Sequence, residues 1–301
     1  MKAIVLTCDT YIYLVDHLIY TYQKVWPSNP FTFIVPYGDE DGEYAQFLKE
    51  KYKNKIELIY TEAARVIHPV EQEVKTAERI KKVSLVKPTM LKLLENIPDE
   101  EWIFWSMDDR YLIKLKTKDA DDIYNYLANI QDKTICFVRL LRGKRFLKDK
   151  FIKKESGITI NKKCRLIETI YTDKTAIVDI WEPQFLRAKV LRRIFENFPN
   201  RPFIPKEMDL LTKEKLVGEK CYVPEKNLIV FGESTHRGQL TENCVASHKK
   251  WGLEITQNFE VSKKYHVTGE LPYQLLGIKI SLPKKLRKTI TSWTRWYWRN
   301  K

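Results

Sequence analysis

The chain lacks the short motifs that mark the commonest nucleotide, zinc and hydrolase sites. Without GxxxxGK(S/T) or GxGxxG it is disfavoured as a P-loop NTPase or a Rossmann dehydrogenase, and without HExxH or GxSxG as a zincin or an α/β-hydrolase. Its five cysteines form no CxxC pair, so we expect neither a zinc knuckle nor a disulfide framework, and a reducing cytoplasm fits. No apolar run approaches the roughly 18 residues of a membrane-spanning helix.

Acidic residues are missing from residues 271–301, which hold eight Lys or Arg and no Asp or Glu. This segment therefore carries +8 of the net charge of +14, and the rest of the chain is only mildly basic. A second basic stretch, RLLRGKRFLKDKFIKK at 139–154, is either a solvated loop or a patch that meets an anionic substrate or membrane.

Hydrophobic patterning predicts strands alternating with helices in the first half of the chain. The start, MKAIVLTCDTYIYLVD, is expected to form a first strand and not a signal peptide. Such βαβα alternation is typical of a parallel sheet covered by helices. We predict strands at 2–7, 31–36 and 56–60, and helices at 9–26 and 43–53.

The second half is expected to continue the same architecture. Strands are predicted at 134–140, 157–161 and 165–171. Trp181-Glu182-Pro183 is expected to open an amphipathic helix that runs to residue 198, with Phe185 and Leu186 on its inward face.

The most informative stretch is EWIFWSMDDRYLIK, residues 101–114. Its run from Trp102 to Trp105 is apolar on both faces, which is typical of a strand in the middle of a sheet. Asp108 and Asp109 follow at the carboxyl end, where open α/β sheets bind ligands. Two hard oxygen donors there predict a site for a divalent cation, Mn²⁺ or Mg²⁺, together with ligand phosphates. The alternative is a pair of solvated turn residues.

Two later segments carry further candidates. Glu207 and Asp209 lie in the first turn of a helix predicted to begin near Pro205, where each acts either as a general base or as a complement to the helix dipole. His236 and Arg237 lie in the Gly-flanked segment GESTHRGQL and either contact diphosphate oxygens or belong to an ordinary polar loop. His17 and His68 are expected to be structural.

The carboxyl-terminal segment has the clearest helical periodicity. An apolar stripe faces a basic face, which predicts an amphipathic helix lying on anionic lipid. The alternatives are a helix docked on the protein's own core and a basic, aromatic arm for nucleic acid. The stripe consists of Leu286, Ile290, Trp293 and Tyr297, and the basic face of Lys284, Lys288, Arg295 and Arg299.

These features together resemble the nucleotide-sugar-dependent glycosyltransferases of the GT-A fold that build bacterial surface glycans. The segment WIFWSMDDRYLI looks like their DxD-type strand. The segment IVDIWEPQFLRAKVLRRI, followed by KEMD, looks like the chain that precedes their acidic acceptor-side helix. The resemblance covers about residues 1–250.

The resemblance implies a role for each candidate. Thr7, Cys8, Asp9 and Asp39 would line the nucleotide pocket. Asp108 or Asp109 would take the metal-bound diphosphate, and Glu207 or Asp209 would be the base of an inverting transfer. The motif departs from the family pattern because it reads MDDR where many relatives have DxD, and Arg110 would then replace the cation electrostatically.

The expected protein is therefore an α/β glycosyltransferase with a GT-A-like, Rossmann-related mixed sheet flanked by helices. A catalytic domain over residues 1–255 would precede an extension over 256–301. It would move a sugar from a nucleotide-diphosphate sugar to a hydroxyl of a lipid-linked glycan, in the cytoplasm at the inner face of the cell membrane. A sugar nucleotidyltransferase and a basic nucleic-acid-binding protein or nuclease are the alternatives, although nucleic acid is not the expected partner.

Overall fold

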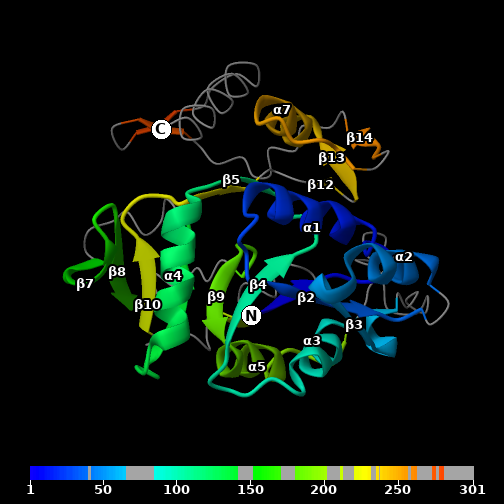
Figure 1. Ribbon diagram of the computed structural model, residues 1–301, viewed down its shortest axis with the longest axis horizontal. Coiled ribbons are helices and arrows are strands. Elements are labelled where there is room, and N and C mark those ends of the chain that lie inside the picture. Colours follow the sequence, from blue (N-terminus) through cyan, green and yellow to red (C-terminus); the bar gives the residue numbers. More distant parts are fainter. Residues whose placement is uncertain are drawn as a thin grey trace.

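The computed structural model describes residues 1–39, 42–65, 85–141, 152–170, 180–201, 211–212, 220–231, 235–236, 238–256, 259–262, 273–275 and 278–280. At the centre lies a nine-stranded mixed sheet in the order β3-β2-β1-β4-β9-β6-β10-β8-β7 (Figure 1). The strands are β1 (Lys2–Leu6), β2 (Thr32–Tyr37), β3 (Ile56–Tyr60), β4 (Trp102–Met107), β6 (Ile135–Arg139), β7 (Ile152–Asn161), β8 (Cys164–Ile170), β9 (Gln184–Arg187) and β10 (Lys220–Pro224).

The strand direction reverses on both sides of β9 and reverses again from β10 to β8 and from β8 to β7. Strands β3, β2, β1 and β4 are mutually parallel. Strand β9 is antiparallel to both β4 and β6, so β6, and β10 beside it, again run in the direction of β4. The β7–β8 hairpin pairs antiparallel with β10 at the far edge. The carboxyl ends of β4, β6 and β10 therefore share one edge of the sheet.

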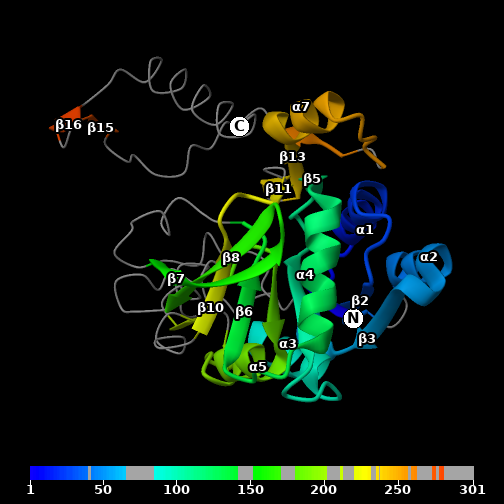
Figure 2. The same cartoon turned by 60° about the vertical axis from the view of Figure 1, so that its left-hand side comes forward.

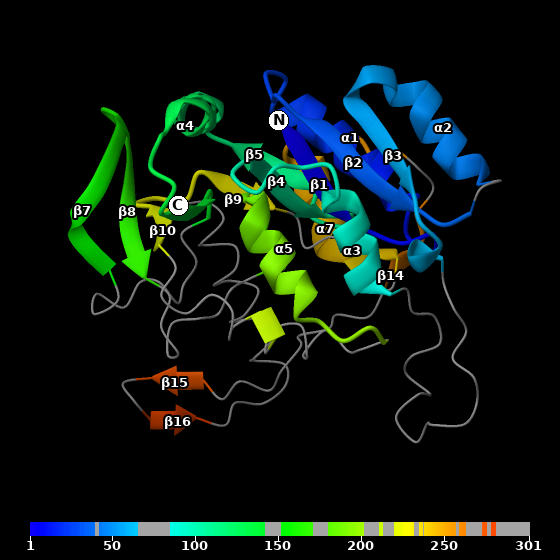
Figure 3. The same ribbon diagram turned by 90° about the horizontal axis from the view of Figure 1, so that it is seen from below.

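Helices cover both faces, with α1 and α4 on one and α3 and α5 side by side on the other (Figures 1 and 3). Smaller elements extend beyond α1, where α7 and β13 lie above it in Figures 1 and 2. The helices are α1 (Leu14–Val25), α2 (Glu43–Tyr52), η1 (Lys53–Lys55), η2 (Glu62–Ala64), α3 (Val86–Leu94), α4 (Thr117–Asn129), α5 (Ala188–Glu196) and α7 (Glu242–Lys250). The minor strands are β5 (Leu112–Leu115), β11 (Ile229–Phe231), β12 (Thr235–His236), β13 (Gln239–Thr241), β14 (Val261–Ser262), β15 (Tyr273–Leu275) and β16 (Ile278–Ile280).

Strand β4 is buried along its whole length because both of its faces meet a core. Trp102 and Phe104 pack into the cluster under α1 and α4, whereas Ile103 and Trp105 pack into the cluster under α3 and α5. This alternation is the two-residue period of a strand. The prediction of a central buried strand is confirmed, and so is the mixed α/β sheet flanked by helices.

The predicted helix over 183–198 is wrong in its first turn, because residues Gln184–Arg187 form strand β9. Phe185 lies in one core cluster and Leu186 in the other, which a strand between β4 and β6 achieves and a surface helix does not. Pro183 precedes the strand, where a missing N–H costs no ladder hydrogen bond. The expected amphipathic helix over residues 284–299 lies outside the described residues, and the division after residue 255 stays a prediction.

The order of the strands creates a switch point between β1 and β4. The chain runs from β1 outward through β2 to β3 and then returns to form β4 on the opposite side of β1. In open α/β sheets, ligands bind outside the carboxyl ends of the strands at such a point. None of the helices in the described residues has both the length and the apolar character needed to cross a membrane.

Candidate functional site

Two predicted residues meet at the switch point. The parallel register sets Leu6 opposite Met107, so the next residues along each strand, Thr7 and Asp108, become neighbours. The Thr7 hydroxyl donates a 2.7 Å hydrogen bond to Oδ2 of Asp108. The Asp108 backbone N–H donates to the carbonyl of Leu6 at 3.2 Å, which continues the pairing one step past the strand. The carboxylate is thus held by the β1–β4 ladder itself.

Asp108 and Asp109 are both half-buried at this edge. Burial raises the pKa of Asp108 well above its usual range, and the neighbouring charge of Asp109 raises it further. The Thr7 hydrogen bond and the charge of Arg110 act in the opposite direction. Two partly desolvated carboxylates side by side are stabilised in their ionised forms by a cation, so the pair fits a hard divalent ion.

The fit requires ligands from outside the protein. Among the described residues, no group of three or more His, Cys, Asp or Glu side chains forms a candidate metal site. Asp108 and Asp109 would therefore leave most coordination positions to water and to ligand oxygens, as Mg²⁺ sites commonly do when phosphates are bound.

A third acid, Asp9, connects the turn after β1 to the end of β2. Its Oδ1 accepts a 2.8 Å hydrogen bond from the backbone N–H of Gly38, and its own N–H donates to the carbonyl of Ala64 at 3.3 Å. A Cβ on Gly38 would overlap the backbone nitrogen of Arg65, so this close approach of two loops requires glycine.

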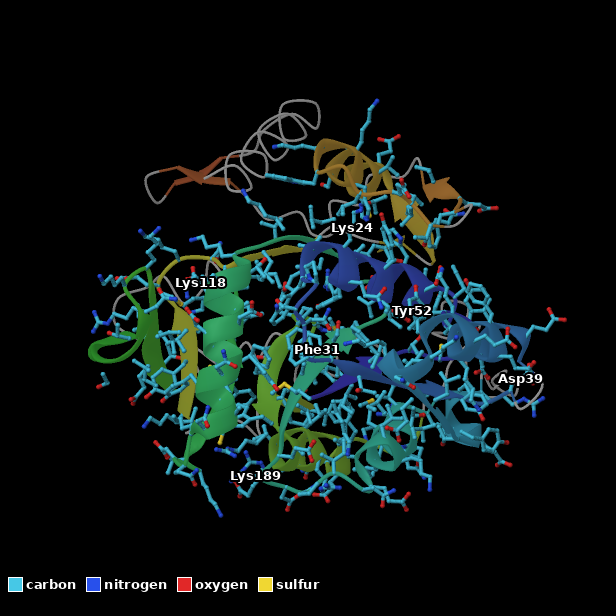
Figure 4. All side chains as sticks on the ribbon, viewed as in Figure 1. Lys24, Phe31, Asp39, Tyr52, Lys118 and Lys189 are labelled. Carbon is cyan, nitrogen blue, oxygen red and sulfur yellow. The ribbon has the colours of Figure 1, made fainter. Side chains whose placement is uncertain are left out.

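Electrostatics couple Asp9 to its neighbour at the next strand end. Burial raises the pKa of Asp9, the Gly38 hydrogen bond opposes that shift, and the charge of Asp39 adds to it. Asp39 itself is exposed, at the right-hand side of the molecule in Figure 4. Cys8 is half-buried, and its carbonyl accepts from the N–H of Tyr11 at 2.8 Å in the turn that leads to α1. Four of the predicted residues thus follow the ends of β1 and β2.

A hairpin from the carboxyl-terminal part of the chain is held against the same edge. The Tyr13 hydroxyl donates a 3.0 Å hydrogen bond to the carbonyl of Gly238, whose φ of +82° favours glycine. Burial raises the pKa of Tyr13, and the charge of Asp108 contributes, so this phenol lies near the acidic pair. In the hairpin, His236 pairs with Gln239 between β12 and β13. Sequence analysis missed Tyr13, although its place in DTYIY directly after the first strand is a signal.

Tyr111 is a second residue that sequence analysis missed. Its side chain is fully buried, and its hydroxyl has no hydrogen-bond partner among the described residues. Burial raises its pKa well above the usual range, followed by the charges of Asp108 and Asp109. The Arg110 Nε donates to the Trp181 carbonyl at 2.8 Å, so this guanidinium is partly committed to the loop before β9.

His17 has the structural surroundings that were expected of it. It is fully buried, and its Nε2 lies 2.8 Å from Nε2 of His248 on α7. The rings of Tyr111 and His17 pack in a T-shaped arrangement with their centroids 4.5 Å apart. The α1–α7 contact therefore lies directly beside the acidic edge.

Several predicted residues lie outside the described part of the chain. These are Glu207, Asp209, Arg237 and His68, while His236 is described in its backbone only. Their roles stay predictions, as do the roles of the residues gathered at the edge.

Comparisons with known proteins give fold-level likenesses only. No family model matches the chain, and no curated protein matches it. Among solved structures, an active-site mutant of LgtC aligns at 13% identity and a TM-score of 0.39, over 74% of this chain and 72% of that one. TarS of S. aureus aligns at 16% identity and a TM-score of 0.41, over 76% of this chain and 58% of that one. The 4-diphosphocytidyl-2C-methyl-D-erythritol synthase of Anaerococcus prevotii aligns at 12% identity and a TM-score of 0.38, over 83% and 96%. A functional assignment therefore rests on the site itself.

Proposed function

We propose that this chain transfers a sugar from a nucleotide-diphosphate sugar to a hydroxyl group of a surface glycan. The observation that carries the proposal is the hydrogen bond between Thr7 and Asp108 at the switch point, with the second carboxylate of Asp109 adjoining. A diphosphate needs a cation to offset its charge, and paired acids at a sheet edge suit that cation.

The roles follow from position. Asp108 and Asp109 would hold Mn²⁺ or Mg²⁺, which when bound neutralises the charge that develops on the diphosphate leaving group. Asp9 and Asp39, at the ends of β1 and β2, would contact the nucleoside, since carboxylates accept hydrogen bonds from hydroxyls.

Residues from the second half would complete the site. His236 belongs to the hairpin that Tyr13 holds beside the edge, and Arg237 follows it in the sequence, so both would contact the diphosphate oxygens. Glu207 or Asp209 would accept the proton of the attacking hydroxyl if the transfer inverts. An exchange of the true base lowers turnover and leaves donor affinity unchanged, whereas an exchange of a donor ligand lowers both.

A thermal-shift screen tests the proposed function. We expect one nucleoside diphosphate to raise the unfolding temperature in the presence of Mn²⁺ and to have a smaller effect in EDTA, because a ligand that binds only the folded state stabilises it. At a concentration of 100 Kd the gain is about 2.7 kcal/mol. Nucleoside monophosphates and inorganic phosphate serve as controls. An unchanged unfolding temperature with every diphosphate would contradict the proposal.

The membrane partner rests on the sequence of residues 284–299, which lie outside the described residues. We propose that this stripe and its cations bind anionic lipid at the inner face of the cell membrane and bring the site to a lipid-linked acceptor. Vesicle co-sedimentation is expected to fall with added salt, with neutral lipid and with Trp293→Glu. If removal of residues 282–301 causes unfolding, the segment is part of the core and the membrane role is wrong.

A further inference from the structure

A basic recess lies away from the acidic site, between α4, the β7–β8 turn and the β10–β11 turn. Its volume is about 520 Å³. Figure 1 shows α4 and β10 beside each other on the left of the molecule, with β8 next to β10. Basic side chains dominate the lining, with one acid among them. They are Lys116, Lys162, Lys163, Arg165 and Lys226, and the acid is Glu225.

Hydrogen bonds between backbone segments hold these three loops together. The N–H of Lys116, just before α4, donates to the carbonyl of Leu228 at 2.8 Å. The N–H of Glu225 donates to the carbonyl of Arg165 at 2.9 Å. Within the β7–β8 turn, Oδ1 of Asn161 accepts from the N–H groups of Lys163 and Cys164, both at 2.8 Å. The basic side chains therefore project from a hydrogen-bonded frame.

The guanidinium of Arg165 is positioned by a glycine. A Cβ on Gly157 would lie 2.7 Å from the Arg165 Nε and 3.0 Å from one terminal nitrogen, closer than side-chain atoms pack. The planar group thus lies against the backbone of β7 at Gly157.

The lysines of the recess are available to a ligand. Within the described ranges, no ion pair involves Lys116, Lys162, Lys163 or Lys226. Lys118, only two residues beyond Lys116, differs because Asp122 pairs with it at 2.9 Å. Five basic side chains around one acid produce a local positive potential that attracts anions.

The recess and the acidic site share one edge of the sheet. Strand β10 runs parallel to β6 and in the direction of β4, so Glu225 and Lys226, after β10, lie on the same edge as Asp108, after β4. Three strand spacings separate β4 from β10, which corresponds to about 14 Å. A linear molecule along the edge can therefore occupy both places.

We propose that the recess binds phosphate groups of an anionic glycan acceptor while the acceptor hydroxyl lies at the acidic site. The inference rests on the proposed function and adds the chemical class of its acceptor. Several cations around one cavity match a multiply charged oxyanion, and Arg165 provides the planar donor that such groups bind.

The lining favours a phosphorylated chain over a lipid surface. The uncharged residues of the recess are Thr159, Asn161 and Cys164, so the recess lining contains no aromatic or long aliphatic side chain. Binding to a membrane surface combines cations with apolar groups that enter the acyl boundary. A concave cavity lined by cations and small polar groups instead suits a hydrophilic anion.

Isothermal titration of the full chain with sodium tripolyphosphate, without divalent cations, tests the recess. Under these conditions the acidic edge repels the probe. We expect Lys162→Gln combined with Lys163→Gln to weaken binding about tenfold or more, because two charge-assisted contacts are lost. The matched control, Lys49→Gln with Lys55→Gln, removes two exposed lysines from the region of α2 and should stay within about twofold of the unchanged chain. Equal affinities of all three proteins, or equal losses in both variants, would overturn the proposal.

Two further measurements distinguish a phosphorylated glycan from a lipid headgroup as the bound anion, and the recess from the acidic site. Vesicles of phosphatidylglycerol should bind the Lys162→Gln and Lys163→Gln double variant as they bind the unchanged chain; a parallel loss of vesicle binding would make the recess a lipid contact and overturn the proposal. Tripolyphosphate binding does not depend on Asp108. Weaker tripolyphosphate binding in the lysine variant therefore supports an anion site in the recess, whether or not a nucleoside diphosphate binds at the acidic edge. If no nucleoside diphosphate binds, only the proposed glycosyl transfer is overturned.

Discussion

Asp108→Asn is expected to leave the folded protein at least as stable as before and to remove cation-dependent nucleotide binding. The amide keeps an oxygen in the place where the Thr7 hydroxyl donates at 2.7 Å. It also removes a carboxylate whose pKa burial and Asp109 raise well above the usual range, so a source of repulsion is lost. The free energy of unfolding should therefore change by no more than about 1 kcal/mol, toward greater stability.

Binding should respond in the opposite direction. Loss of an outer-shell partner of a metal ion already weakens metal binding about 10–100-fold, and Asp108 is proposed as a direct ligand. We therefore expect the affinity for a nucleoside diphosphate with Mn²⁺ to fall by about 10² or more, and turnover to fall with it. Asp109→Asn should act in the same direction, because a two-carboxylate site loses half of its protein charge.

Calorimetric titration with Mn²⁺ and the diphosphate found in the thermal screen measures the effect. Asp122→Asn is the matched control, since Asp121 and Asp122 are also adjacent acids but lie on α4 with Lys118 as the ion partner of Asp122. That control should keep the affinity of the unchanged chain. Unaltered nucleotide binding in both Asp108→Asn and Asp109→Asn would exclude a role of this pair in the donor site.

The sequence predicts the central strand because its evidence is local. Trp102 to Trp105 are apolar at consecutive positions, and only a strand with two covered faces buries all of them. Strand β9 is different. The apolar residues Phe185 and Leu186 fit a helix that begins at residue 183, and they fit a strand of four residues equally well. Its insertion between β4 and β6 is decided by tertiary packing, which local periodicity does not contain.

In the candidate site, too, local sequence predicts some of the residues but not the contacts between them. Asp108 and Asp109 can be predicted from their place after a buried run, whereas Thr7 and Asp9 are candidates because of the resemblance to GT-A glycosyltransferases. The contact between Thr7 and Asp108 depends on the register of two strands that are about one hundred residues apart in the chain. The approach of Tyr13 to Gly238 spans 225 positions and is invisible to local patterns. The recess likewise needs three loops brought together by the β7–β8 hairpin and β10.

The His17–His248 pair should make the folded protein sensitive to acid. The Nδ1 of His248 lies 2.8 Å from the carbonyl of Cys244, which can only accept, so this nitrogen carries the proton of the neutral ring. Its Nε2 is then an acceptor, and the Nε2–H of His17 donates to it at 2.8 Å. The Nδ1 of His17 in turn accepts from the Thr256 hydroxyl at 3.1 Å. With both rings neutral, every ring nitrogen has a hydrogen-bond partner.

Protonation of His248 at Nε2 places two N–H donors face to face, and protonation of His17 at Nδ1 directs a new N–H at the Thr256 hydroxyl; either one puts a positive charge inside the core. Burial, followed by the charge of His248, lowers the pKa of His17 to about 3, and burial lowers the pKa of His248 as well. In the unfolded chain a histidine has a pKa of about 6.5. The unfolded state therefore binds more protons at every pH between these values, and stability falls as the pH falls below about 6.5.

The expected loss from His17 alone is about 2 kcal/mol at pH 5 and about 3 kcal/mol at pH 4, relative to pH 8. Above pH 6.5 the contribution of the pair is complete, and it disappears as the pH approaches 3. Urea unfolding at pH 8, 6.5, 5 and 4 measures this dependence. His17→Gln is the matched variant, because its amide can donate to His248 but does not titrate.

The variant should be less stable than the unchanged chain at pH 8 and should lose less free energy between pH 8 and pH 5. Equal losses in the two proteins would mean that His17 is not held neutral, and the proposed tautomers would be wrong.

The histidine pair lies close to the candidate site. His17 attaches α7 to α1, and one turn earlier Tyr13 of the same segment holds Gly238. Acid that loosens the pair should therefore also loosen the hairpin that carries His236, and nucleotide affinity should fall over the same pH range, beginning below about 6.5.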